Sequence, residues 1–394
     1  MQNESFILTE SLTGTEHIEL STNLPVEKKV GKICYEVMHM EKIVATISSI
    51  GKVNVVDAKF MPYDLYLEKE EDDLDIDTMM NNLNNFYHWC ASRVLSLDRK
   101  YAKEILNSIG VAQAVTDKDR ANISLSYHCV SLNDVYWIRK QGEDISFESI
   151  NLYDNPLNEA VVEISLKGRQ MTVTNWELAP DLSTKGCFPK AWIRGENGFR
   201  LLKDGGNDAV KKELLASKIC QCFEVPQVKY KQSFYQGQPV SESKIVTSKE
   251  WSMVSKMAFD IYACNHNLDT IAECQRLDPI TFYGMNILDY LTGNTDRHPE
   301  NWGFLVNNET NECVSLYPLM DFNQCFLSYD NLDGANCQTL LPRKITQREA
   351  AIEAVKEVGL LQVKEVDMSA FEDMKDEAEM FQRRLDELKK WIIS

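Results

Sequence analysis

Long apolar runs are missing from this chain of 394 residues. No stretch approaches the roughly 20 apolar residues that a membrane-spanning helix needs, so the sequence predicts no membrane segment. The opening residues, MQNESFILTESLTG, have neither a basic start nor an apolar core, and we expect no signal peptide. These features predict a cytoplasmic protein that does not act at a membrane.

Paired cysteines are also missing. The 11 cysteines form no C-x-x-C pair, and the nearest two, Cys220 and Cys222, fall two apart in an expected helix. Side chains two apart on a helix do not face each other. A structural zinc site needs clustered, tetrahedrally placed ligands, and none is visible. We therefore expect reduced thiols, as in a cytosolic protein.

The chain has too little basic charge for direct binding to nucleic acid. Its 42 Lys and Arg residues against 60 Asp and Glu residues give a net charge of −18. A phosphate backbone requires a basic face, so no direct nucleic-acid partner is expected. Apolar residues make up 44% and charged residues 26%, which is typical of a globular protein. At roughly 150 residues per domain, the length predicts two or three packed units.

The N-terminal part, residues 1–122, is expected to be an α/β module whose role the sequence does not indicate. Residues 30–56 are rich in Val, Ile and Tyr, which favours strands. Residues 79–106 place apolar side chains on one helical face, and we expect a single helix there.

Two lobes are predicted in the rest of the chain. Residues 123–250 contain short β-like pieces, SLNDVYWIR, AVVEISL, KAWIR and FRLLKDG, ahead of a helix at about 208–223. Residues 251–394 are mostly helical, apart from one hairpin that runs from GFLV to CVSLYPL. The last helix carries a heptad-like apolar stripe, which we interpret as a helix docked on its own domain. The order predicts an α+β fold with a β-rich N-lobe and a mainly helical C-lobe.

The most informative segment is GNTDRHPENWGF, residues 293–304. Asp296 and Asn301 stand five apart on a loop between a helix and a strand, and Asp321 follows beyond the hairpin. Phosphoryl transfer uses these residue types: one carboxylate orients the attacking hydroxyl and accepts its proton, while an amide and a second carboxylate hold Mg²⁺. Each piece alone is common, since D-x-x-x-x-N arises by chance and Asp-Arg-His also suits a salt-bridged turn.

The preceding lobe supplies the other groups that such chemistry needs. Lys203 ends the strand FRLLK, and Glu213 lies in the next helix, so an ion pair between them would hold the lysine against nucleotide phosphates. Neither G-x-G-x-x-G nor G-x-x-x-x-G-K-[ST] is present, but a small polar stretch, DLSTKGCFPKAWI, occupies the expected place of a phosphate loop. A hairpin turn would have the same composition. The candidate phosphate-loop residues are Ser183, Thr184, Lys185, Gly186 and Lys190.

GNTDRHPENWGF followed by LMDFN resembles the catalytic loop and metal aspartate of the HipA-like kinases, which are bacterial serine/threonine kinases related to protein and lipid kinases. The family loop N-x-D-x-H-x-x-N is matched by Asn294, Asp296, His298 and Asn301. STKGCFPKAW resembles the family's phosphate loop, and FRLLKDG resembles the strand that supplies the ATP-contacting lysine. The resemblance spans roughly residues 125–330.

The resemblance implies a two-lobed, protein-kinase-like fold and ATP- and Mg²⁺-dependent phosphorylation of a protein serine or threonine. Asp296 would be the catalytic base, with Asn301 and Lys203 also catalytic, and Asn301 and Asp321 would be the metal ligands. The implied cofactor-binding residues are Lys203, Glu213, Lys190, Gly186, Ser183, Thr184, Lys185 and His298. Adenine contacts are expected from Ser243 to Thr247, from position alone.

Other functions stay open at this point. Asn323 makes the metal motif DFN rather than DFG. The same loop chemistry serves small-molecule and lipid-headgroup kinases, and a pseudokinase that only binds a nucleotide or partner is a third reading. A pseudokinase would be expected to have lost at least one of the site residues, but all five are present: Lys203, Glu213, Asp296, Asn301 and Asp321. Family members include toxins that act beside an antitoxin, so a toxin-type growth regulator with an antitoxin-like partner is a further implication; the protein substrate is not identified.

The resemblance also implies self-phosphorylation in the phosphate loop. Ser183 stands seven residues before Lys190, with Thr184 beside it. Phosphate there adds about two negative charges next to the expected site of the ATP phosphates, so it should inhibit the enzyme. We expect intact-mass spectrometry after incubation with ATP and Mg²⁺ to show added phosphate that maps to Ser183 or Thr184. An Asp296→Ala variant should gain none, and equal gain in both proteins would contradict the prediction.

Overall fold

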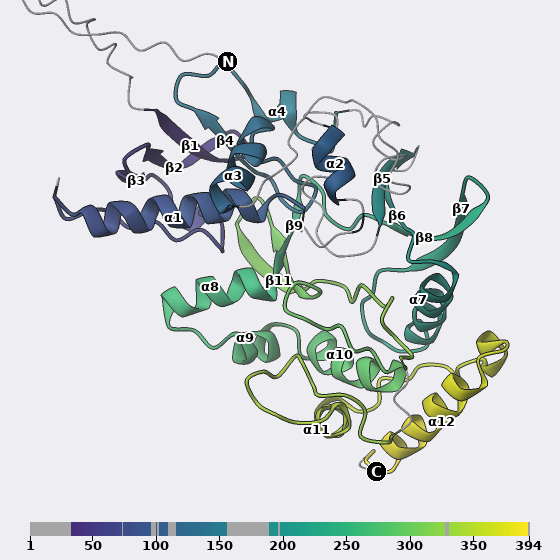
Figure 1. Cartoon of the computed structure of the whole chain (residues 1–394). Coiled ribbons are helices and arrows are strands. Elements are labelled where there is room, and N and C mark those ends of the chain that lie inside the picture. Colours follow the sequence, from purple (N-terminus) through teal and green to yellow (C-terminus); the bar gives the residue numbers. More distant parts are fainter. Residues whose placement is uncertain are drawn as a thin grey trace, which may run out of the picture. The chain divides into compact units, whose positions relative to one another are not determined.

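A computed structural model describes residues 33–72, 74–95, 100, 102–108, 116–155, 189–195, 198–327 and 331–392 (Figure 1). The strands are β1 (Cys34–His39), β2 (Lys42–Ser48), β3 (Val53–Val55), β4 (Tyr136–Lys140), β5 (Lys190–Gly195), β6 (Gly198–Lys203), β7 (Tyr230–Tyr235), β8 (Gln238–Lys244), β9 (Trp251–Ser255), β10 (Gly303–Asn307) and β11 (Glu312–Leu316). The α-helices are α1 (Ile76–Ser92), α2 (Ala102–Ser108), α3 (Asp117–Ser126), α4 (Phe147–Ile150), α7 (Asn207–Cys220), α8 (Lys256–His266), α9 (Thr270–Leu277), α10 (Pro279–Thr292), α11 (Gln347–Val358) and α12 (Lys375–Lys389). Two 3₁₀ helices cover Ala58–Phe60 and Met368–Phe371.

The N-terminal sheet has the antiparallel order β3-β2-β1-β4. Alternate residues of β1 and β4, such as Val37 and Ile138, pack with Phe86 and Trp89 of α1 in one buried cluster. The strands expected within residues 30–56 are therefore present. The expectation that SLNDVYWIR belongs to the N-lobe is corrected, because β4 pairs with β1. A period of two residues identifies a strand but not its partner. The boundaries at residues 122 and 250 stay a prediction. We use the name N-terminal module for the described residues from 33 to 155, which include β4.

The single helix expected over residues 79–106 is wrong, because α1 ends at Ser92 and α2 is separate. The backbone N–H of Arg93 turns back to the carbonyls of Ala91 and Cys90. Its guanidinium is drawn into the module, where it pairs with Asp134 at 2.7 Å. Helical periodicity continues past this point in the sequence, but the buried ion pair fixes the chain direction instead.

The N-lobe is a sheet with order β5-β6-β8-β7, against which α7 packs (Figure 1). KAWIR and FRLLK are strands, β5 and β6, as predicted, and the structure pairs them antiparallel; AVVEISL lies outside the described residues. The register sets Lys190 directly opposite Lys203. Directly opposed residues of two strands point to the same face of a sheet, so both ammonium groups face the same side.

The C-lobe follows β8 and is mainly helical, which confirms the predicted α+β architecture of a β-rich lobe ahead of a helical one. The predicted hairpin is β10 and β11, but β9, which we did not predict, completes a sheet of order β11-β10-β9. Nearly every side chain of α10 from Thr281 to Thr292 is buried, and α10 packs against α11. This helix leads directly into the segment 293–302.

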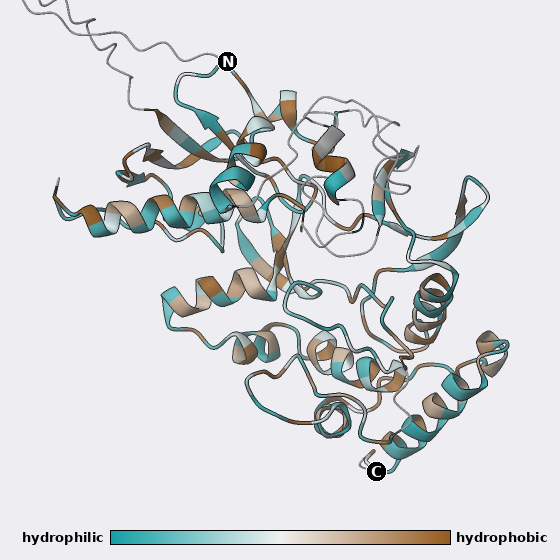
Figure 2. Cartoon of the chain, in the orientation of Figure 1, coloured by the Kyte–Doolittle hydropathy of each residue, from teal (hydrophilic) through white to brown (hydrophobic). Residues whose placement is uncertain are grey.

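The last helix, α12, docks on the C-lobe. Its residues Phe381, Leu385 and Leu388 are buried in the C-lobe core, and Arg384 donates a hydrogen bond to the carbonyl of Tyr290 at 2.6 Å. In Figure 2 its turns are mostly hydrophilic, with hydrophobic ones between them. The heptad-like stripe therefore faces its own domain, as we interpreted it.

Asn311, in the β10–β11 turn, joins the C-lobe to the N-terminal module. Its carbonyl accepts a hydrogen bond from the hydroxyl of Tyr63 at 2.8 Å, and its amide donates to the carbonyl of Lys59 at 2.8 Å. The hydroxyl of Tyr136 in β4 donates to Asn311 Oδ1 at 3.1 Å. These bonds tie the module to the hairpin of the C-lobe.

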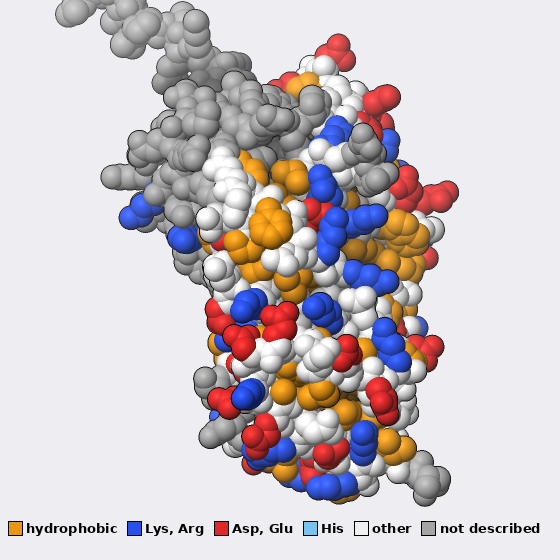
Figure 3. All heavy atoms as spheres, turned by 90° about the vertical axis from the view of Figure 1, so that its right-hand side faces the viewer, with side chains coloured by type: hydrophobic (Ala, Val, Ile, Leu, Met, Phe, Trp, Pro, Cys, Tyr) orange, Lys and Arg blue, Asp and Glu red, His pale blue; other side chains and the backbone are white. Residues whose placement is uncertain are grey.

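Acidic and basic side chains are intermixed on the face that Figure 3 shows, so the negative net charge does not make this face uniformly acidic. In the described part of the chain, none of the helices combines the length and the apolar character that crossing a membrane requires.

Gly303 permits the close approach of β10 to β9. A Cβ there would overlap the carbonyl oxygen of Val254 and lie 2.7 Å from Ser255 Cα, and both neighbours are backbone. We expect Gly303→Ala to lower the free energy of unfolding by about 1–3 kcal/mol, as overpacking does. Gly195→Ala is the control, because its Cβ would meet only the flexible Arg200 side chain. Urea unfolding measures both, and equal stability of the two variants would contradict the prediction.

Candidate active site

A buried arginine holds the loop 293–302 in place. α10 ends at Gly293, whose φ of 60° lies in the left-handed region, and the chain turns away from the helix there. Arg297 then binds both carboxylate oxygens of Asp289 at 2.9 Å. Its guanidinium also donates to the carbonyls of Asn301 at 3.0 Å and Met320 at 2.7 Å. One buried side chain therefore fixes the loop to α10 and to the segment that carries Asp321.

The loop brings Asp296 and Asn301 together. Asn301 donates through Nδ2 to the backbone carbonyl of Asp296 at 2.8 Å. This bond turns Nδ2 toward the loop and leaves Oδ1 as the acceptor available to a ligand. Asn294 Oδ1 accepts from the backbone N–H of Asp296 at 3.1 Å, so three residues of the N-x-D-x-H-x-x-N pattern interact directly.

The electrostatic surroundings of Asp296 raise its pKa above the usual aspartate range. Partial burial is the largest cause, since it disfavours the charged carboxylate. The charge of His298, whose Nε2 lies 3.8 Å from Asp296 Oδ1, opposes the shift, and the charge of Asp321 adds to it. A carboxylate with a raised pKa is a stronger base than an ordinary aspartate.

Lys203 stands between two carboxylates from different lobes. Its Nζ lies 2.8 Å from Glu213 Oε1 in α7 and 3.0 Å from Asp321 Oδ1 in the C-lobe. Burial disfavours its charge, but the two carboxylates outweigh this effect and hold the pKa of Lys203 well above its usual value. The other oxygen of Glu213 accepts a hydrogen bond from the hydroxyl of Ser241 in β8, which the sequence analysis did not single out.

Asp321 is ionised in these surroundings. Burial alone would raise its pKa, but the charges of Lys203 and Lys190 lower it to about 2. Lys190 is itself buried, opposite Lys203 on β5. The predicted phosphate-binding lysine and the predicted metal aspartate thus share one site. The other phosphate-loop candidates, Ser183, Thr184, Lys185 and Gly186, lie outside the described residues.

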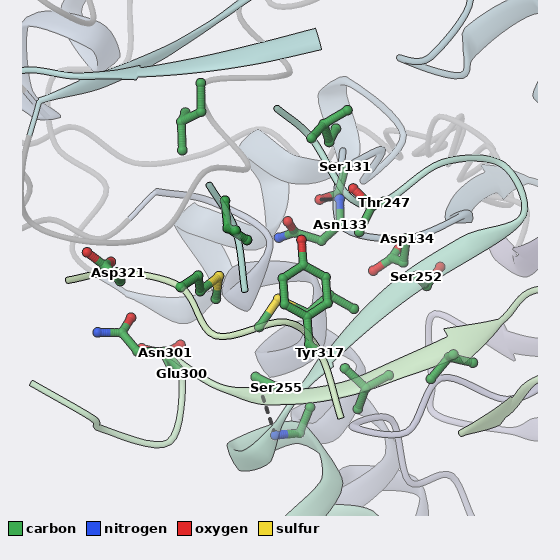
Figure 4. A pocket seen from close by; sticks show the side chains of 18 of the residues that line it. Ser131, Asn133, Asp134, Thr247, Ser252, Ser255, Glu300, Asn301, Tyr317 and Asp321 are labelled. Carbon is green, nitrogen blue, oxygen red and sulfur yellow. Dashed lines mark hydrogen bonds between the residues drawn. The ribbon is translucent and has the colours of Figure 1, made fainter. Parts of the chain in front are cut away.

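A cavity of about 590 Å³ connects these residues with the N-terminal module. Lys203, Asp296, Asn301 and Asp321 line one end. Figure 4 shows Asn301 and Asp321 at that end and Tyr317 in the middle of the cavity. At the far end it shows several polar side chains, which come from two segments of the chain. This far-end group consists of Ser131, Asn133, Asp134, Thr247 and Ser252.

The predicted adenine-contacting segment lines the cavity through Ser243, Ile245 and Thr247. Residues 131–134 were not predicted to be near it. They carry no motif, and their position depends on the pairing of β4 with β1, which the local sequence does not specify.

The residues present fit a magnesium ion. Asn301 Oδ1 and the ionised Asp321 are oxygen donors of the kind Mg²⁺ prefers, and Mg²⁺ in such sites takes one or two protein ligands beside substrate phosphates. Asn323 lines the same cavity, and within the described chain its buried Oδ1 has no hydrogen-bond partner. The described part of the chain holds no cluster of three or more His, Cys, Asp or Glu side chains suited to a metal ion.

No family model matches this chain, and no curated protein matches it. Among solved structures it is similar to the Helicobacter pylori proinflammatory kinase CtkA, with 18% identity and a TM-score of 0.38 over 52% of this chain and 90% of that one. It is also similar to a Shewanella oneidensis MR-1 complex of the toxin–antitoxin proteins HipA and HipB with operator DNA, with 10% identity and a TM-score of 0.46 over 91% of this chain and 95% of that one. These names agree with the predicted resemblance to HipA-like kinases. Such distant likeness carries nothing further on the activity, which has to come from the site.

The two carboxylates make Lys203 important for stability. We expect Lys203→Met to lower the free energy of unfolding at neutral pH by on the order of 3–5 kcal/mol, because it leaves buried carboxylates without their partner. The ion pair with Asp321 stabilises the fold above the pKa of an unfolded aspartate and is lost as the pH falls toward about 2. The loss of unfolding free energy caused by Lys203→Met should therefore become smaller below about pH 4.

Lys211→Met is the matched control for this prediction. Lys211 lies on α7 and pairs at the surface with Asp373 at 3.8 Å, so its loss should cost less than about 1 kcal/mol. Urea unfolding at pH 7 and at about pH 3, between the pKa values of Asp321 in the unfolded and folded chain, tests both variants. A deficit for Lys203→Met that does not exceed the control, or does not change with pH, would show that the buried pairs contribute little.

Proposed function

We propose that this chain is an ATP- and Mg²⁺-dependent kinase that phosphorylates a serine or threonine hydroxyl of a protein. One observation carries the proposal: Lys203 of the N-lobe contacts both Glu213 and Asp321, residues that the sequence separates by 10 and 118 positions, at the cavity that Asp296 and Asn301 also line. Kinases use this set of residue types in these places.

The residues divide the work by position. Lys203 and Lys190 offer positive charge to the nucleotide phosphates. Asn301 and Asp321 would hold Mg²⁺, which neutralises charge on the phosphates when it is bound. Asp296 orients the attacking hydroxyl and accepts its proton as the oxygen–phosphorus bond forms and the bond to ADP breaks. Its raised pKa suits it to this role.

The finer parts of the proposal rest on the loop resemblance. A protein substrate, phosphorylation of Ser183 or Thr184, a toxin-type role and an antitoxin-like partner all follow from the likeness of GNTDRHPENWGF to the HipA-like loop. The same loop chemistry serves kinases that phosphorylate small molecules or lipid headgroups, so the kinase chemistry and the identity of the acceptor are separate parts of the proposal.

Asp296→Asn tests the chemistry. The amide keeps the shape of the side chain but cannot accept the proton, so we expect the transfer of labelled phosphate from ATP to fall by about 10²–10⁴-fold. Binding of ATP with Mg²⁺, followed by thermal shift, should persist. Asp376→Asn, an exposed position on α12, is the control and should leave the rate unchanged. Undiminished transfer by Asp296→Asn would refute the assignment of the base.

A further inference from the structure

The N-terminal module closes the far end of the cavity with a firmly held segment, residues 131–134. Asp134 binds the guanidinium of Arg93 through both oxygens, at 2.7 and 2.8 Å. The carbonyl of Leu132 accepts hydrogen bonds from the hydroxyls of Thr247, at 2.5 Å, and Tyr153, at 3.0 Å. The segment is thus fixed both to its own module and to the connection between the lobes.

Asn133 is held by its backbone alone. Its N–H donates to Ser131 Oγ at 3.0 Å, and its carbonyl accepts from the N–H of Met253 in β9 at 2.8 Å. Across the whole described chain, its side-chain amide takes part in no hydrogen bond, although it lines the cavity. A polar group that is held in place but left without a partner at a cavity wall is suited to meet a ligand.

The distribution of charge along the cavity indicates which part of a nucleotide Asn133 would contact. Phosphates belong at the end that holds Lys203 and Lys190, so the base must extend toward the opposite end. Apolar side chains also line the cavity and suit a flat aromatic ring. They are Leu201, Val228, Ile245, Met253, Val254 and Met320.

An amide is chemically suited to adenine. It presents a donor and an acceptor side by side, and adenine presents N6–H beside the acceptor N7, a pairing that asparagine commonly makes with adenine. Guanine presents two acceptors, O6 and N7, on the same edge, so one of its hydrogen bonds with an amide is lost there. The amide of Asn133 can therefore distinguish adenine from guanine by hydrogen bonding.

We propose that Asn133, from the N-terminal module, pairs with the edge of adenine and is a determinant of the preference for ATP over GTP. This inference rests on the proposed function, because it requires a nucleotide in the cavity. It gives residues 131–134 a role in the substrate site: the module completes the base end of a site whose catalytic groups all lie elsewhere in the chain.

The test uses two uncharged substitutions in the full-length protein. Asn133→Leu removes both hydrogen-bonding groups at nearly equal size, and Asn133→Ala removes both without adding bulk or charge. Dissociation constants for ATP and GTP, each with Mg²⁺, are measured by calorimetry, with Asn265→Leu on the exposed face of α8 as the matched control. Thermal unfolding reports whether each variant is folded.

We expect both Asn133 variants to bind ATP at least about 5-fold more weakly, within the 5- to 150-fold range of a bidentate base contact. GTP affinity should fall by less than ATP affinity, because guanine has one hydrogen bond with the amide to lose where adenine has two, so the ATP preference falls. Asn265→Leu should bind as wild type. Unchanged ATP affinity in both variants, or an equal loss for ATP and GTP, overturns the role of Asn133 and leaves the proposed kinase chemistry standing. A wild-type protein that binds neither nucleotide overturns both.

Discussion

The site depends on the ion pairs that the buried ammonium group of Lys203 forms. This group pairs with both carboxylates that face it, and the charge of Lys190 on the neighbouring strand also favours the ionised form of Asp321. Each carboxylate would be costly to bury alone, since an unpaired charge in a protein interior is strongly unfavourable. Because Glu213 belongs to α7 and Asp321 to the C-lobe, the electrostatics of one side chain fix the distance between two lobes.

A second buried cation performs the corresponding task within the C-lobe. Arg297 joins Asp289 of α10 to the carbonyls of Asn301 and Met320, so the loop and the segment before Asp321 share one anchor. Positioning of reacting groups to within a fraction of an ångström accounts for a large part of catalysis, and rigid backbone supports provide it. Lys203 and Arg297 together hold Asp296, Asn301 and Asp321 in one frame.

The sequence predicted what depends on local pattern. Lys203 could be placed because a period of two residues and a following helix put it at a strand end, and the pair with Glu213 follows from that order. Asp296 and Asn301 could be placed because a short loop between helix and strand allows few arrangements.

What could not be predicted depends on contacts between distant parts of the chain. The end of α1 at Ser92 follows from the ion pair of Arg93 with Asp134, 41 positions away. The pairing of β4 with β1, and the approach of residues 131–134 to Thr247, likewise have no local signature. The polar far end of the cavity therefore became visible only in the structure.

The hydrogen bonds of Asn311 can form only late in the synthesis of the chain. Tyr63 and Lys59 must wait for a partner that lies 248 and 252 positions further along the chain. At about 5–20 residues per second, a ribosome needs roughly 12–50 s to add that length. The N-terminal sheet can form early from its own strands, but its contacts with the hairpin close much later, and such long-range closures slow the completion of the fold. A nascent chain of this protein thus spends much of its synthesis with that docking surface uncovered.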